Sequence, residues 1–148
     1  MSQQARDWLI SHPNTLFQRD TQRDDLRDEN VTKTELIALL VDLIQKGHII
    51  LFTAVKSDHH PDNDLGFHSH ENGFCADVWP LNTTAPTDYV NANEPKMIQF
   101  LADAARSTWL YQIGLAGSAD TAQDTSAAGR TKFSDDGADH IHLGANSD

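Results

Sequence analysis

Two segments of this chain carry side chains that could bind and use a metal ion. One is His140-Ile141-His142, and the other runs from His70 to Asp77 and reads His-Glu-Asn-Gly-Phe-Cys-Ala-Asp. Two imidazoles and a carboxylate suit a catalytic zinc site, which takes three protein ligands and leaves one position for water. Side chains alternate along a strand, so His140 and His142 would share one face. One ring could then bind the metal while the other reaches a substrate.

The elements that must position these side chains form a mixture of helices and strands. Asn72 and Gly73 are typical of a turn, which would bring His70 back beside a strand carrying Asp77. We expect strands over residues 48–55, 74–79 (ending before Pro80), 109–115 and 141–143. We expect helices over residues 3–11, over 36–44 after a Thr32-x-x-Glu35 capping box and before Gly47, and from Asn93-Glu94-Pro95 onward with an apolar stripe of Met97, Leu101, Ala104 and Ala105.

The order of these elements does not follow a clean βαβ alternation. It favours an α+β fold, with a small antiparallel sheet flanked by helices and the zinc site on the sheet. The length of 148 residues predicts one domain over 1–148, and the 39% hydrophobic content indicates a globular chain. Within it, residues 1–30 form a helical and polar lead-in, in which 18–30 is a solvated loop or a polar helix. Residues 117–132 have no apolar period and are predicted to be a mobile loop.

Charge and targeting signals exclude several classes of function. The formal net charge of −11 argues against a nucleic-acid or anionic-membrane partner, and a divalent cation would offset part of it. The one cysteine excludes an internal disulfide. The first residues show no basic-then-apolar signal, and no apolar run is long enough to span a bilayer. We therefore expect a chain made in the cytoplasm, which would need a separate route if it works outside a cell. For its oligomeric state we favour a monomer.

Both segments also resemble a known family. The segment from His70 to Asp77 resembles the His-x-x-Gly-x-Ala-x-Asp motif of the D-alanyl-D-alanine metallopeptidases, with Cys75 in place of the alanine. The segment ending at His142 is similar to their third-ligand segment. The murein endopeptidases of this LAS-type group and the hedgehog signalling domain share the zinc scaffold. The resemblance covers residues 48–144, is most specific at the two motifs, and implies Zn²⁺ bound by His70, Asp77 and His142.

The resemblance also implies roles for the neighbouring residues. The family's general base is usually a glutamate three residues before the last histidine, where this chain has the shorter Asp139; the hedgehog-type pattern favours Asp136 instead. Such a carboxylate would take a proton from the zinc-activated water as it attacks an amide carbonyl, and then protonate the leaving amine. His140 would stabilise the oxyanion. Lys56 is the best match to a family arginine, although lysine cannot clamp a carboxylate bidentately.

Other histidines and aromatic residues have simpler interpretations. His59 and His60 are expected on the surface, although their acidic loop could form a substrate rim or a second cation site. Cys75 is expected to pack beside Asp77 rather than to bind metal. Aromatic residues on strands are usually packing residues, so Trp79 and Trp109 are expected in the core or in a cleft wall.

The combined expectation is a zinc-dependent peptidase that cuts D-amino-acid-containing stem peptides or cross-links of peptidoglycan. The substrate class comes entirely from the resemblance, since the residues themselves support only metal-assisted amide hydrolysis. The small size and missing signal resemble a phage or prophage lytic enzyme (an endolysin) or a tail-associated one. Two alternatives stay open. One is a zinc-stabilised binding module without turnover, suggested by Lys56 and Asp139; the other is a structural phage component with an acidic surface.

Overall fold

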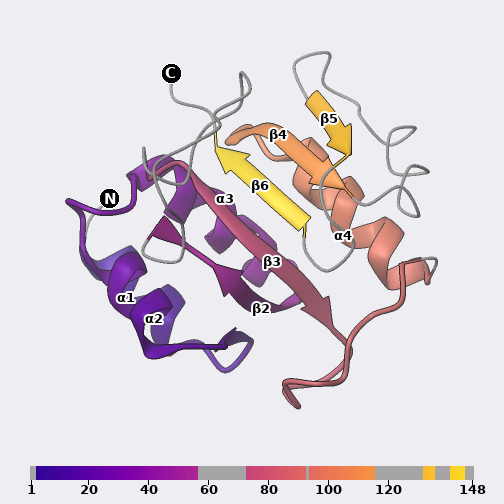
Figure 1. The fold of residues 1–148 in the computed structure, drawn as a ribbon, viewed down its shortest axis with the longest axis horizontal. Helices are drawn as coiled ribbons and strands as arrows, with labels where there is room; N and C mark the ends of the chain where they lie inside the picture. Colours follow the sequence, from indigo (N-terminus) through magenta and orange to yellow (C-terminus); the bar gives the residue numbers. More distant parts are fainter. Residues whose placement is uncertain (1–2, 57–72, 93, 116–131, 136–140, 146–148) are drawn as a thin grey trace.

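The computed structural model describes residues 3–56, 73–92, 94–115, 132–135 and 141–145. The described elements are α1 (Gln3–Ser11), β1 (Thr15–Phe17), α2 (Asp20–Arg27), α3 (Thr34–Gln45), β2 (Ile49–Ala54), β3 (Cys75–Leu81), α4 (Pro95–Arg106), β4 (Leu110–Leu115), β5 (Lys132–Asp135) and β6 (Ile141–Ala145). Figure 1 shows the strands side by side, with α3 and α4 behind them. None of the helices described is long and apolar enough to cross a membrane.

The strands form a six-stranded sheet in the order β1-β2-β3-β6-β4-β5. The three inner pairs, β2–β3, β3–β6 and β6–β4, are antiparallel, whereas the outer pairs β1–β2 and β4–β5 are parallel. The α+β class is confirmed, but the sheet is mixed rather than purely antiparallel. A parallel pair needs a long crossover connection, and α2 with α3 supplies it between β1 and β2.

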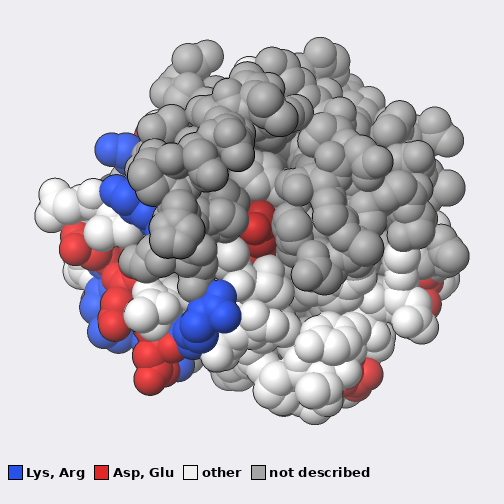
Figure 2. Space-filling view, in the orientation of Figure 1, with Lys and Arg blue, Asp and Glu red and all other residues white. Residues whose placement is uncertain are grey.

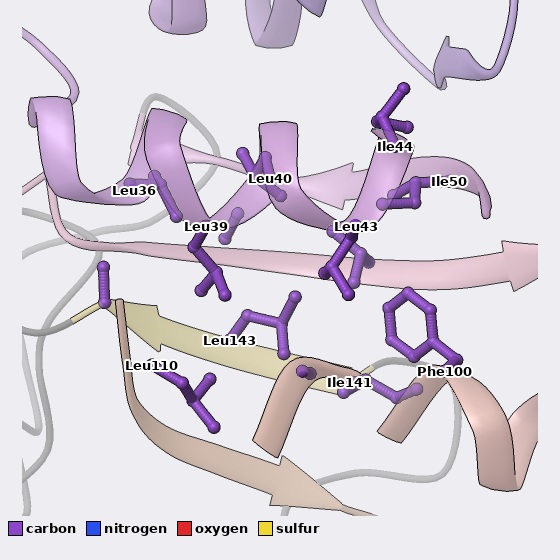
Figure 3. Close-up of a cluster of buried hydrophobic side chains, with 14 of the residues drawn as sticks. Leu36, Leu39, Leu40, Leu43, Ile44, Ile50, Phe100, Leu110, Ile141 and Leu143 are labelled. Atoms are coloured by element: carbon purple, nitrogen blue, oxygen red, sulfur yellow. The ribbon is translucent and has the colours of Figure 1, made fainter. Parts of the chain in front are cut away.

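The hydrophobic core lies between the sheet and the pair α3 and α4. Helix α3 buries an apolar surface made of Leu36, Ile37, Ala38, Leu39, Leu40, Leu43 and Ile44. In Figure 3, leucines of α3 approach Ile141 and Leu143 of β6, and Phe100 of α4 points into the same layer. Full burial of each such side chain stabilises the fold by about 1.5–3 kcal/mol. Because this packing fixes one face of β6, it also fixes which of its side chains turn to the opposite face.

The predicted helices are confirmed, with one error at a helix start. Helix α1 covers the predicted range, α3 stops before Gly47 at φ +92°, and Pro95 stands in the first turn of α4. The predicted capping box is wrong: α3 has Lys33 as its N-cap, without a side-chain cap hydrogen bond. The hydroxyl of Thr32 instead donates to the carbonyl oxygen of Asp25 (2.8 Å), because Thr32 is fully buried one residue before the cap.

Strand β3 continues through Pro80, where the sequence predicted its end. Pro80 stands opposite Ile50, whose N–H donates to the carbonyl oxygen of Asn14 in the direction of β1 (2.8 Å). That pair therefore makes no ladder hydrogen bond that would need an N–H on Pro80. On the other side of β3, the pairing with β6 reaches only as far as Val78. Beyond Val78, residues 88–90 meet this side of β3, and the N–H of Val90 donates to the carbonyl oxygen of Pro80 (3.1 Å). The N–H that proline lacks is not missed, because the carbonyl oxygen of Val90 accepts a hydrogen bond from the indole N–H of Trp79 (2.9 Å).

Two strands were not predicted. Strand β1 has only three residues, which is too short for an alternating pattern to be recognised. Strand β5 begins at Lys132, the last residue of the predicted loop over 117–132, and the other residues of that loop lie outside the described ranges. Residues 18–30 contain the polar helix α2, which was one of the two expectations for them.

Four charged residues of α2 form two ion pairs. Asp20 pairs with Arg23 at 3.2 Å and Asp24 with Arg27 at 3.7 Å, each three residues apart on the exposed face. Figure 2, in the view of Figure 1, shows blue and red side chains intermixed on the left, over α1 and α2. Exposed pairs of this kind contribute little stability and leave no strong field of one sign. This surface is therefore a solvated helix face rather than a binding site for a charged polymer.

Candidate metal centre

Asp77 and His142 meet at the centre of the sheet, on β3 and β6. They are direct Cα partners in the antiparallel ladder between these strands. The residues flanking them, such as Val78 and Leu143, belong to the hydrophobic core beneath α3 and α4. Since side chains alternate along a strand, Asp77 and His142 point to the sheet face opposite these helices. The structure thus brings together two of the three predicted zinc ligands from segments 65 residues apart.

The two side chains are close and buried. Nδ1 of His142 lies 3.2 Å from Oδ1 of Asp77, and the side chains are 10% and 5% exposed. A hydrogen bond explains this distance. A shared zinc ion explains it equally well: ligand atoms 2.0–2.1 Å from a tetrahedral zinc are about 3.3 Å apart. The separation of the two atoms therefore matches that of two ligands on one zinc ion, and a buried carboxylate needs a partner of this kind.

An irregularity in β2 lies beside Asp77. The register between β2 and β3 shifts between Phe52 and Ala54, so that Ala54 becomes the partner of Asp77. Bulges of this kind re-aim side chains and are frequent beside active sites. Strand β2 ends there, and the half-buried Lys56 follows two residues later. Lys56, which was predicted to bind the substrate, therefore follows the end of β2 at which Ala54 pairs with Asp77.

Cys75 lies on the same strand face as Asp77, two residues earlier. It is fully buried and is the Cα partner of Gly144. The two tryptophans are half-buried and pack against the core, as predicted, and the indole N–H of Trp79 donates to the carbonyl oxygen of Val90 (2.9 Å). Neither tryptophan is needed to explain the pair of Asp77 and His142.

The remaining predicted site residues lie outside the described ranges. They are His70, Asp139, His140, the alternative base Asp136, and the surface histidines His59 and His60. Within residues 3–56, 73–92, 94–115, 132–135 and 141–145, no group of three or more His, Cys, Asp or Glu side chains could hold a metal ion. Of the three predicted zinc ligands, the structure therefore describes Asp77 and His142.

Comparison with family models, with curated proteins and with solved structures finds no match for this chain. The candidate site is therefore argued from its own geometry and from its two sequence motifs.

Gly73 fixes the chain just before β3. Its φ of +79° is a left-handed conformation that glycine adopts readily, and a Cβ there would collide with the carbonyl oxygen of Val31. The N–H of Lys33 donates to the carbonyl oxygen of Gly73 (2.8 Å). The segment before α3 thus holds the turn that follows the predicted ligand His70 and leads into the strand of Asp77. Gly73 has the positive φ expected in the predicted turn, whose other residue, Asn72, lies outside the described residues.

Arg6 supports this segment from α1, a role that the sequence interpretation missed. Its guanidinium is buried and donates to the carbonyl oxygen of Leu26 (2.8 Å) and to both the hydroxyl (2.8 Å) and the carbonyl oxygen (2.6 Å) of Thr32. Burial lowers the pKa of Arg6, while the carboxylates of Glu29 and Asp28 act to raise it. Its spacing in the sequence could have indicated that Arg6 is buried, because Arg6 lies three residues before Leu9 and therefore on the same, buried side of α1.

Proposed function

We propose that this chain is a zinc-dependent peptidase that hydrolyses peptide bonds in peptidoglycan stem peptides or cross-links containing D-amino acids. The observation that carries the proposal is the buried pair of Asp77 and His142, with ligand atoms 3.2 Å apart on the sheet face away from α3 and α4. Both residues end motifs that resemble those of LAS-type zinc peptidases. The substrate class and a phage or prophage origin are supported by that resemblance alone.

The proposed zinc ligands are His70, Asp77 and His142. A bound zinc ion supplies Lewis-acid activation of water and polarises the scissile carbonyl. Asp77 contributes a negative charge whose burial the cation would compensate. His142 contributes a neutral imidazole, oriented by its place in the ladder between β3 and β6.

The other proposed roles belong to groups around the metal. Asp139 accepts a proton as the amide is attacked and returns it to the leaving amine, with Asp136 as the alternative base. His140 donates a hydrogen bond to the developing oxyanion. Lys56, attached to the end of β2 beside Asp77, pairs with a substrate carboxylate as a single point charge. In this assignment, substrate binding by Lys56 and proton transfer by Asp139 belong to different segments of the chain.

A zinc-stabilised binding module without turnover is the second candidate. The observation that favours it is the burial of Asp77 and His142, since structural zinc sites are closed whereas catalytic sites keep an open position. Lys56 and Asp139, which depart from the family pattern, also favour the binding module. The two candidates share the metal and differ in whether a substrate is consumed.

Digestion of purified peptidoglycan separates the two candidates. The protein is incubated with the wall with and without a chelator, and released fragments are identified by mass spectrometry. Chelator-sensitive release of peptide fragments is the result expected of a peptidase. Stoichiometric zinc without any release would favour the binding module. A chain that binds no zinc would overturn both and leave the structural phage component.

A further inference from the structure

A second polar site lies at the other end of the sheet. A cavity of about 200 Å³ opens between the turn after α3, the end of β3 and the first turns of α4. Leu81, which lines it, pairs with Ile49, whereas Asp77 pairs with Ala54. Leu81 lies four residues beyond Asp77 along the extended strand β3, or about 13 Å. The cavity is therefore distinct from the candidate metal centre, and its function is argued independently.

The cavity combines an apolar floor with a basic rim. The floor includes Leu81 and Val90, which are 3% and 1% exposed. The rim includes Lys46 and Lys96, which are both exposed. The described residues that line the cavity include no Asp or Glu. Lys46 and Lys96 place two positive charges on the rim, against the carboxylate of Asp103 that lies behind His48 and Gln99, and the balance of these groups favours an anion.

One carboxylate holds two of the polar groups that line this cavity. Oδ2 of Asp103 lies 2.7 Å from Nε2 of His48, and both side chains are nearly buried at 13% and 12% exposure. Oδ1 of Asp103 accepts a hydrogen bond from the amide of Gln99 (2.9 Å). The ring of Phe100 packs edge-on against the His48 ring, with centroids 5.2 Å apart. His48 and Gln99 are thus oriented before any ligand arrives, which lowers the entropic cost of binding.

We propose that this cavity binds a small organic anion. Its acidic group would lie among Lys46, Lys96 and His48, and its apolar part would cover Leu81 and Val90. The volume is below the roughly 300–1,000 Å³ of pockets for drug-sized ligands. It equals about six or seven water volumes, which suits a short-chain acid of a few heavy atoms. A carboxylate and a phosphate monoester share this chemistry, and a titration with each distinguishes them.

The test is an NMR titration of the full ¹⁵N-labelled chain at constant ionic strength. The probes are butyrate, butyl phosphate and, as a neutral control, butanamide. We expect saturable shifts of the amides of Gly47, Ile49 and Leu81 with at least one of the two acids, with a Kd in the millimolar range. Butanamide should give none. The acid that binds identifies the head group. Absence of saturable binding by both acids, or equal binding of butanamide, would overturn the proposal.

Two sets of variants test the assigned groups. Lys46→Gln combined with Lys96→Gln should raise the Kd at least 5-fold, whereas Lys33→Gln, at an exposed lysine that does not line the cavity, should leave it unchanged. Asp103→Asn keeps the side-chain volume but removes the carboxylate, which both orients His48 and repels the anion. We expect the orienting role to outweigh the repulsion, so that the Kd rises 2-fold or more while the remaining amide spectrum is retained. An unchanged Kd in the double variant, or an equal effect of Lys33→Gln, would overturn the anion site. An unchanged or lower Kd in Asp103→Asn would exclude its orienting role.

Discussion

Asp77 and His142 are Cα partners at the centre of the sheet, and Oδ1 of one lies 3.2 Å from Nδ1 of the other. A hydrogen bond and a shared zinc ion both account for this distance, but they differ in their consequences. A hydrogen bond needs only these two residues. A zinc ion needs a third ligand, releases protons on binding and adds to the stability of the native state.

The first prediction concerns metal content. Protein purified without added metal should carry about one zinc per chain by elemental analysis, as the ligand motifs imply. Asp77→Asn and His142→Ala should each lose the metal. His12→Ala is the matched control, because His12 lies after α1, where its ring contacts Trp8. Zinc below ~0.2 equivalents in the parent chain, not restored by added zinc, would contradict the site.

The second prediction concerns thermal stability. Asp77 and His142 are 65 residues apart, so an ion bound to both closes a long loop in the native state. Binding at 100 times the Kd stabilises the native state by about 2.7 kcal/mol. Chelation should therefore lower Tm by roughly 5–10 °C in a chain of this size. The measurement is a thermal melt followed by circular dichroism. An unchanged melt after verified zinc removal would mean that the two side chains meet without a metal.

The third prediction concerns the general base. Asp139→Asn keeps the size of the side chain but cannot accept a proton, so turnover of a wall-derived peptide should fall by at least ~100-fold. Zinc content should not change. Asp136→Asn should cost far less activity. The reverse ranking, with an active Asp139 variant and an inactive Asp136 variant, would transfer the role to Asp136. Full activity in both would exclude a base from this segment.

The fourth prediction compares two glycines that both have positive φ. An alanine at Gly47 meets no atom within 4 Å, so Gly47→Ala should cost only the left-handed backbone conformation, about 1–2 kcal/mol. An alanine at Gly73 would also collide with the backbone of Val31. Gly73→Ala should therefore lower the free energy of unfolding by more than ~2 kcal/mol, measured by urea denaturation. If the two variants lost equal stability, Gly73 would not be held against Val31.

Local patterns predicted most of the helices and their limits. Helices α1, α3 and α4 were predictable because apolar residues recur at helical spacing and because Gly47 and Pro95 mark boundaries by their own backbone preferences. The prediction of a capping box was wrong because the hydroxyl of Thr32 is already hydrogen-bonded to the buried guanidinium of Arg6. Residue types at a fixed spacing cannot show that a distant arginine competes for the same hydroxyl.

Non-local relationships were less predictable. The motifs led us to expect Asp77 and His142 near each other, but not that they would be direct partners in the ladder. The parallel outer pairs of the sheet depend on β1 and β5, whose sequences carry no strand pattern of their own. Pro80 can continue β3 because the carbonyl oxygen of Val90, on the neighbouring segment, takes its hydrogen bond from the indole of Trp79 instead. Each of these outcomes is decided by a neighbour on another segment of the chain.

The place of β6 has a consequence for how the chain matures. β6 is the last described strand in the sequence, yet it is inserted between β3 and β4. During synthesis, β3 and β4 therefore wait with open backbone edges, which can pair with other chains, until residues 141–145 arrive. The same strand carries His142, so the pairing of β6 with β3 and the meeting of His142 with Asp77 occur in one step. A nascent chain stalled before residue 141 would expose these edges and be prone to aggregation, and it would also lack one of the two side chains of the candidate metal centre.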